Sequence, residues 1–189
     1  ATKGYRTNIE TFVQANKQLR QLSYYEYRYE EILTEDTIVS IKTLPLTVGT
    51  QTLIDVCKSD SGATGKKLRE AHTKLGSLVA KTITQDFPGE KFAVVIMMRS
   101  GLSFGMGIAD ELDAPVLFFD DKNTTLFENQ LKDNPQLQDY RLILCDGVVN
   151  TGKTILELAN AYQDYRPIIA TNVISEKYDG NNTIAVYAS

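Results

Sequence analysis

The chain has 189 residues, of which 42% are hydrophobic and 23% charged, and its net charge at pH 7 is −4. This composition is ordinary for one globular domain, so it excludes a disordered chain, a fibrous repeat and a disulfide-rich scaffold. The negative net charge gives no general support to nucleic-acid binding. No apolar run approaches the ~20 residues that a membrane-spanning helix needs.

The two cysteines, Cys57 and Cys145, lie far apart in the sequence and have no neighbouring cysteine or histidine at a metal-binding spacing. This pattern favours reduced thiols over a disulfide. We therefore expect a cytoplasmic protein that binds neither nucleic acid nor a membrane. We also expect Cys145 to be buried and to point away from its neighbour Asp146, because side chains alternate along a strand.

Residues 1–35 are predicted to form a helical N-terminal extension. Apolar residues recur at helical spacing over 8–22, and residues 24–29 contain four tyrosines. Such a cluster favours packing against the core or a partner subunit. Base stacking is the alternative, but no basic groove accompanies the tyrosines.

Residues 37–44 alternate in polarity and predict a strand, while the polar, glycine-containing residues 58–67 predict a mobile loop. A long amphipathic helix follows over 68–83. His72, the only histidine, is expected to be a polar residue of this helix rather than a catalytic base.

Strands and helices alternate after that helix. Residues 92–98 are apolar on both faces, as in a central parallel strand. The later elements are predicted to be a helix at 101–112, a strand at 115–119, a polar excursion at 123–138, a strand at 141–145, a helix at 151–165, a strand at 168–175 and an edge strand at 183–187. This order predicts one α/β domain over 1–189, with a mostly parallel twisted sheet covered by helices on both faces.

Residues 146–154 follow a buried strand and open a helix, which is where ligands bind in parallel α/β sheets. Gly152 permits a close backbone approach, and Thr151 and Thr154 offer hydroxyl groups. Successive amides at a helix N-terminus can bind a phosphate. Residues 147–154 also match the G-x-x-x-x-G-K-T pattern of P-loop NTPases. Against that alternative, the strand at 168–175 lacks an aspartate to hold magnesium, and Asp146 would have no role.

The run from Leu142 to Thr154 resembles the signature by which type I phosphoribosyltransferases bind phosphoribosyl pyrophosphate (PRPP). The resemblance implies that Asp146 accepts hydrogen bonds from the ribose hydroxyls and acts in catalysis, since a carboxylate suits a diol. It further implies that the 5′-phosphate is bound by Asn150, Thr151, Gly152, Lys153 and Thr154.

The residues around Arg99, Ser100 and Gly101 resemble the pyrophosphate-binding loop of uracil phosphoribosyltransferases. An arginine at a strand end and a glycine before a helix suit a diphosphate, and Arg99 is the second expected catalytic residue. Uracil enzymes carry two further arginines where this chain offers Lys58 and Lys122 as pyrophosphate ligands, and lysine lacks the bidentate fork of arginine. The uracil-type resemblance covers roughly residues 64–154.

The sequence departs from the family in two ways. Gly147 replaces the second acid that many members carry, and no glycine-rich base-binding segment follows the last predicted strand. We therefore expect another element, such as the tyrosine-rich region, to cap the base site.

The resemblance implies transfer of a phosphoribosyl group from PRPP to a pyrimidine base, such as uracil, with release of pyrophosphate. Mg²⁺ would be carried by PRPP and pyrophosphate, without a resident metal site. A homo-oligomer, a dimer or larger, is also implied. The departures motivate an alternative, a non-catalytic regulator of the same fold that binds PRPP or a nucleotide. A P-loop NTPase stands third.

Overall fold

One six-stranded sheet organises residues 41–189, the part of the chain that the computed structural model describes. In spatial order its strands are β1 (Ile41–Thr43), β6 (Thr183–Ala188), β5 (Ile168–Ile174), β4 (Arg141–Val149), β2 (Phe92–Met97) and β3 (Val116–Phe119). All neighbouring strands pair in parallel. The predicted α/β class is confirmed.

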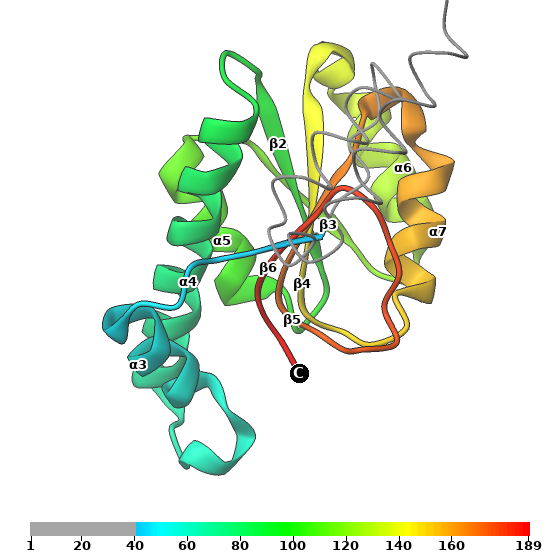
Figure 1. The fold of residues 1–189 in the computed structure, drawn as a ribbon. Helices are drawn as coiled ribbons and strands as arrows, with labels where there is room; N and C mark the ends of the chain where they lie inside the picture. The colour runs from blue at the N-terminus through cyan, green and yellow to red at the C-terminus, as the bar shows by residue number, and fades with distance from the viewer. Residues whose placement is uncertain (1–40) are drawn as a thin grey trace, which may run out of the picture.

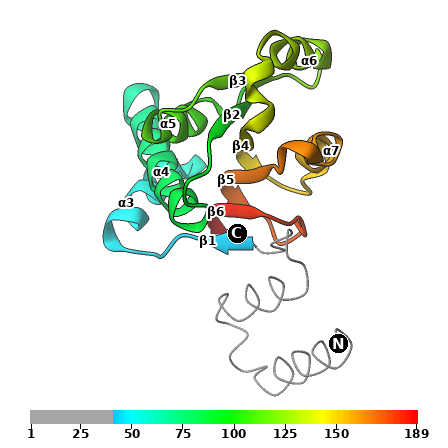
Figure 2. The same ribbon diagram turned by 90° about the horizontal axis from the view of Figure 1, so that it is seen from above.

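Helices cover both faces of the sheet (Figures 1 and 2). One face carries α4 (Gly65–Asp86) and α5 (Leu102–Leu112), and α3 (Val48–Cys57) packs beside α4. The other face carries α6 (Thr124–Asp133) and α7 (Lys153–Ala161). Three short 3-10 helices complete the described part: η2 (Ser59–Ser61), η3 (Pro135–Asp139) and η4 (Gln163–Tyr165).

The core consists of two apolar layers, one on each face of the sheet. Along β4, Ile143 and Cys145 face the layer under α4 and α5, whereas Leu142 and Leu144 face the layer under α6 and α7. All four side chains are fully buried. Burial on both faces explains why the central strands read as continuous apolar runs in the sequence.

Two glycines allow α4 and α5 to approach closely. A Cβ atom on Gly76 would overlap the carbonyl oxygen of Phe104, and one on Gly107 would overlap the carbonyl oxygen of Thr73. The two helices therefore touch through their backbones, and this contact fixes how α5 leaves the end of β2.

β6 differs from its prediction as an edge strand, because it pairs with β5 on one side and β1 on the other. Residues 175–182 connect the end of β5 to the start of β6 without a helix. This connection is shorter than the usual crossover between parallel strands, which has roughly a dozen residues. Figure 1 shows this orange-red connection passing beside α7. It is anchored by the buried Tyr178, whose hydroxyl lies 2.6 Å from Thr183 Oγ1.

Two helices were not predicted. Residues 123–138 contain α6, which buries Phe127 and Leu131 one turn apart, rather than a polar excursion. α3 follows the predicted first strand, and the predicted mobile loop at 58–67 contains η2 and the start of α4. In α6 and α3 the buried residues are few, so the helical period is weak in the sequence.

The exposed edge of β3 is closed by a side chain. The amide group of Gln130 on α6 donates to the Phe118 carbonyl oxygen and accepts from the Phe118 N–H, both at 2.8 Å. These are the backbone groups through which an edge strand would recruit another strand. The sheet is thereby protected from extension at β3.

The predicted N-terminal extension, its helix at 8–22 and the tyrosine cluster at 24–29 lie outside the described residues. The strand predicted at 37–44 is present over its described part as β1. No helix within residues 41–189 is both long and apolar enough to cross a membrane.

Gly76→Ala is expected to destabilise the protein by about 1–3 kcal/mol, because the added methyl group must displace the backbone of α5. Chemical denaturation followed by circular dichroism measures the change. Gly49→Ala is the matched control, since Gly49 is an exposed residue of α3 where an added Cβ atom would make an ordinary contact, at 3.9 Å, with Thr47 Oγ1. That control should be neutral or slightly stabilising. Equal effects of the two substitutions would contradict the close helix contact.

Candidate active site

The predicted site residues meet at the carboxyl edge of the sheet. Because all strands are parallel, the ends of β2 and β4 lie at the same edge, at the bottom of Figure 1. The loop after β2 contains Arg99, Ser100 and Gly101, and the loop after β4 leads into α7. The structure therefore brings the two sequence motifs side by side.

The loop after β2 rests directly on the end of β4. Gly101 lies against the carbonyl oxygen of Cys145, and a Cβ atom on Gly147 would lie 2.6 Å from the Ser100 carbonyl oxygen. Both positions need glycine because backbone approaches backbone there. Gly147, which takes the place of a second acid in the family pattern, is thus required by packing.

Asp146 links these two segments. Its Oδ1 atom accepts hydrogen bonds from the Ser100 hydroxyl and, at 2.7 Å, from the Gly147 N–H. Partial burial raises the pKa of the carboxyl group, and the hydrogen bonds from Ser100, Gly147 and Val148 oppose that shift. One oxygen of the carboxylate, Oδ1, therefore joins the two segments of the protein. These two hydrogen bonds do not involve the other oxygen, Oδ2.

Cys145 is buried on the opposite face, as predicted, in the layer under α5. Burial raises the pKa of its thiol, so it remains protonated and inert.

The loop after β4 has the form of an anion site. Gly152 adopts a left-handed conformation with φ of 76°, and α7 begins at the next residue without a side-chain cap. The first amides of a helix lack partners within the helix and favour negative charge. Thr151, Lys153 and Thr154 are exposed around them.

A pocket of about 650 Å³ lies next to this edge, between the sheet and the segment joining α3 to α4. That segment contributes Cys57, Lys58, Ser59 and Asp60 to its wall. The opposite wall and floor are made by His72, Ser100, Gly147, Val148, Asn172, Val173, Tyr187 and Ser189. Within the described residues, the α3–η2 segment therefore forms part of the wall of this pocket.

Among the described residues, two side chains that line this pocket each have a buried polar atom without a hydrogen-bond partner. The two atoms are Oδ1 of Asn172, a residue only 2% exposed, and Nδ1 of His72. A buried acceptor without a partner costs about 1–3 kcal/mol. Burial lowers the pKa of His72, so its imidazole is uncharged at neutral pH. Burial also raises the pKa of Cys57 to about 11, which keeps that thiol protonated.

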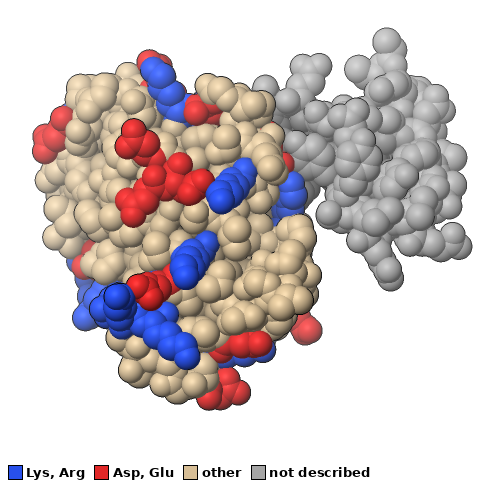
Figure 3. Space-filling model, turned by 90° about the vertical axis from the view of Figure 1, so that its left-hand side faces the viewer, with Lys and Arg blue, Asp and Glu red and all other residues tan. Residues whose placement is uncertain are grey.

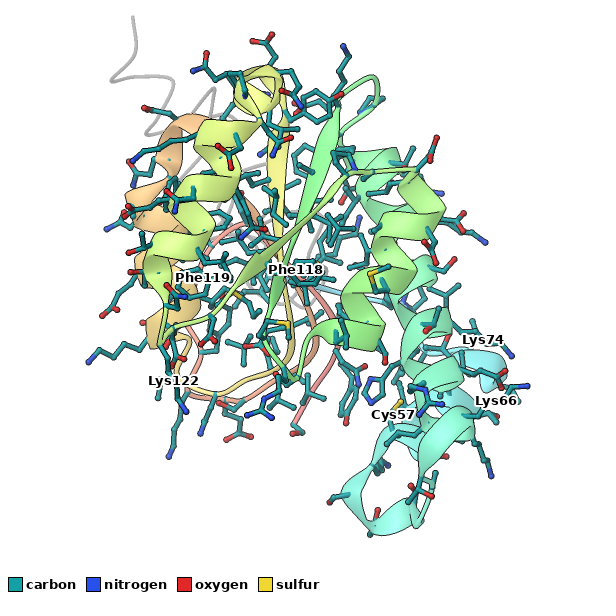
Figure 4. All side chains as sticks on the ribbon, turned by 180° about the vertical axis from the view of Figure 1, so that it is seen from behind. Cys57, Lys66, Lys74, Phe118, Phe119 and Lys122 are labelled. Atoms are coloured by element: carbon teal, nitrogen blue, oxygen red, sulfur yellow. The ribbon has the colours of Figure 1, made fainter. Side chains whose placement is uncertain are left out.

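The residues predicted to bind pyrophosphate do not all lie at this pocket. Lys58 shares the pocket with Ser100, and its ammonium group lies 3.1 Å from Asp55 Oδ1. Arg99 is exposed at the sheet edge. Lys122 follows β3 and does not line this pocket. Figure 4 shows Lys122 on the side of α6, away from Cys57 on the side of α3.

Sequence reasoning missed Asn172 and Tyr187 as pocket residues, and it treated His72 as a plain helix residue. A signal for Asn172 was present, because it is an amide within an otherwise apolar buried strand. His72 gave no comparable signal, since α4 alternates polar and apolar residues throughout.

Charged side chains of both signs are scattered over the side of the molecule that carries α3, α4 and α5 (Figure 3). Lys66, Lys67 and Arg69, near the start of α4, are exposed, and Lys66 pairs with Glu70 at 3.7 Å. Exposed pairs of this kind contribute little to stability. These residues form a solvated basic surface.

A second pocket, of about 640 Å³, lies beside α7 near the amino ends of β4 and β5. Arg141 and Arg166 line it, and Glu90 Oε1 accepts hydrogen bonds from both guanidinium groups. None of the predicted site residues lines this pocket.

No family model and no curated protein sequence matches the chain. Similar solved structures exist. The AQ2163 protein of Aquifex aeolicus is 14% identical with a TM-score of 0.61, covering 79% of this chain and 88% of its own. A hypothetical protein of Neisseria gonorrhoeae with bound ppGpp is 12% identical with a TM-score of 0.50, covering 64% and 80%.

A hypoxanthine-guanine phosphoribosyltransferase of Bacillus anthracis is 13% identical with a TM-score of 0.48, covering 64% of this chain and 78% of its own. At these identities the similarity concerns the fold alone. The uracil-type closeness gains no support from these comparisons.

Asp146→Asn is expected to leave the fold at least as stable as the wild type at neutral pH. Because the pKa of the folded carboxyl is raised, ionised Asp146 weakens the fold above that pKa, and this penalty is absent below the unfolded pKa. The difference in melting temperature, variant minus wild type, should therefore be positive near pH 7, shrink as the pH falls toward 3.8 and be absent below that value. Circular dichroism measures it, with exposed Asp139→Asn as the control. A large loss of stability at pH 7 would show that the carboxylate is mainly structural.

Proposed function

We propose that this chain is a phosphoribosyltransferase that transfers the phosphoribosyl group of PRPP to a nucleobase and releases pyrophosphate. The observation that carries the proposal is the position of Asp146. It lies near the carboxyl end of the buried parallel strand β4, between the Arg99–Gly101 loop on one side and the uncapped N-terminus of α7 on the other. The phosphoribosyltransferase-like fold agrees with it.

Each part of PRPP has a matching group at this edge. The 5′-phosphate would bind the backbone amides at the start of α7, with the Thr151 and Thr154 hydroxyls beside them. The second oxygen of Asp146 would accept from the ribose hydroxyls. The guanidinium of Arg99 and the backbone at Gly101 would hold the diphosphate, and Mg²⁺ would arrive bound to PRPP.

The reaction needs positioning and charge more than a nucleophilic side chain. A ring nitrogen of the base forms a bond to C1 of the ribose while the bond from C1 to the pyrophosphate oxygen breaks. Pyrophosphate leaves with the bonding electron pair, and the proton on the nitrogen passes to solvent. Asp146 places negative charge near the ribose as it becomes oxocarbenium-like, which stabilises the transition state.

The pocket beside Ser100 would hold the base. Lys58 lies at that pocket and can approach the pyrophosphate if it exchanges its partner Asp55, whereas Lys122 would have to reach across from the side of α6. A pyrimidine acceptor, the homo-oligomeric state and the cytoplasmic location remain predictions from the sequence.

A regulator that binds PRPP or a nucleotide without catalysis is the second candidate. It is favoured by Gly147, which supplies no second acid, and by the fold similarity to the protein of Neisseria gonorrhoeae with bound ppGpp. Binding without any release of pyrophosphate would select it.

Nucleotide hydrolysis by a P-loop is not proposed. In that pattern a glycine-rich loop between the strand and the helix wraps the phosphates. Here β4 extends to Val149, and Val148 pairs with Val173 of β5. Gly147 is therefore part of the strand, and too few residues remain to form the loop.

Arg99→Ala is expected to raise the KM for PRPP about 10- to 100-fold, because a charged contact to the diphosphate is lost. Pyrophosphate release is measured with Mg²⁺, PRPP and a panel of bases. Arg166→Ala is the matched control, since Arg166 is an exposed arginine at the second pocket. The proposal fails if Mg-PRPP does not bind the wild type, or if both variants behave alike.

A further inference from the structure

Asn172 occupies an unusual place in the sheet. It follows Ile168 and Ala170 on the face of β5 that packs toward α4, where its neighbours are apolar. Within the pairing of β4 and β5, Asp146 lies opposite Thr171 and Val148 opposite Val173. Gly147 is therefore the residue beside Asn172, and it has no side chain that could hydrogen-bond to the amide.

The described residues around Asn172 offer no hydrogen bond to its side-chain oxygen. Its Oδ1 atom has no partner, and His72, which reaches the same pocket from α4, has an unpartnered Nδ1 atom. Buried polar side chains are normally hydrogen-bonded, so an exception at a pocket indicates a missing partner. The two atoms come from opposite sides of the site, one from the sheet and one from the helix.

The charged residues at the pocket indicate that the part of a ligand bound there is uncharged. Lys58, the cation among the lining residues, is paired with Asp55, and Asp60 lies beside it. Burial lowers the pKa of His72, which removes its positive charge at neutral pH. The carboxylate of a base such as orotate would therefore find no unpaired positive charge among these lining residues.

We infer that this pocket binds the acceptor base, and that Asn172 and His72 select a neutral heterocycle with a lactam edge, a ring N–H beside a carbonyl group. This inference rests on the proposed function. The Asn172 oxygen accepts the ring N–H, and the neutral imidazole, protonated at Nδ1, donates to a carbonyl oxygen. Oxopyrimidines such as uracil and oxopurines such as hypoxanthine carry this edge.

The position of the pocket agrees with that role. Ser100 and Gly147 belong both to the pocket wall and to the contact that holds Asp146. Side chains alternate along β4, so Asp146 faces away from Gly147 and Asn172. A base at Asn172 would therefore reach the ribose site over the end of β4, where Ser100 contacts both Gly147 and Asp146. The α3–η2 segment covers the pocket from outside and limits access of water.

The test compares Asn172→Leu with the wild type, using uracil, hypoxanthine, adenine and orotate as probes in the presence of Mg-PRPP. Affinity is measured by calorimetry and stability by thermal unfolding of the free proteins. The variant should bind uracil or hypoxanthine at least about tenfold more weakly. It should also melt at a higher temperature, because an unpartnered buried oxygen is removed. A purely structural role for the amide predicts a lower melting temperature and unchanged base affinity.

Two further measurements do not depend on the folding of that variant. Thr171→Val, the adjacent residue on the same strand, should leave base affinity unchanged, because the Thr171 hydroxyl is bonded to the Val173 carbonyl within the strand. On the wild type, methylation of the ring N–H of the better-bound lactam base should abolish binding. Equal binding of the methylated base, a preference for adenine or orotate, or wild-type affinity in Asn172→Leu would overturn the inference.

Failure of the proposed function gives a different result. In that case Mg-PRPP neither binds nor stabilises the wild type or any variant. If Mg-PRPP binds while none of the four bases binds, the inference about the acceptor is wrong and PRPP binding stands.

Discussion

The candidate site depends on the contact between the loop after β2 and the end of β4. Gly101 lies against the Cys145 carbonyl oxygen, Gly147 lies against the Ser100 carbonyl oxygen, and the Ser100 hydroxyl donates to Asp146. Any side chain at either glycine would separate the two segments. Because the backbones touch, a diphosphate group at one loop and a ribose phosphate at the other could be held at a fixed separation, which is what a positioning catalyst needs.

The parallel sheet makes that contact possible. Apolar layers on both faces bury β2 and residues 141–145 of β4, so the carboxyl ends of these strands are firm supports for two exposed loops. The glycine contacts between α4 and α5 extend the same frame to His72, which lies on α4 in the turn before Gly76. The pocket residues thus come from elements held by the core, while the α3–η2 segment closes over them.

Stability and binding oppose one another at this edge. Burial raises the pKa of Asp146, which means that its ionised form is disfavoured in the folded protein. Asn172 likewise keeps an amide oxygen without a partner within an apolar strand. Neither group improves the free fold, and a ligand with hydroxyl or N–H donors would satisfy each of them in the functions proposed above. Polar groups kept at such a cost are typical of functional sites.

The amino-acid sequence alone determined the fold class, the central strands and the two loops that carry Arg99 and Asp146, because continuous apolar strands and a strand–turn–helix signature are local patterns. It did not predict α3 or α6, whose few buried residues give a weak period. It also could not place Asn172 opposite Gly147 or His72 across from them, since those neighbours depend on strand register and on how closely α4 approaches the sheet. Only the tertiary structure decided which polar residues share a pocket, because contacts between distant segments leave no spacing in the chain.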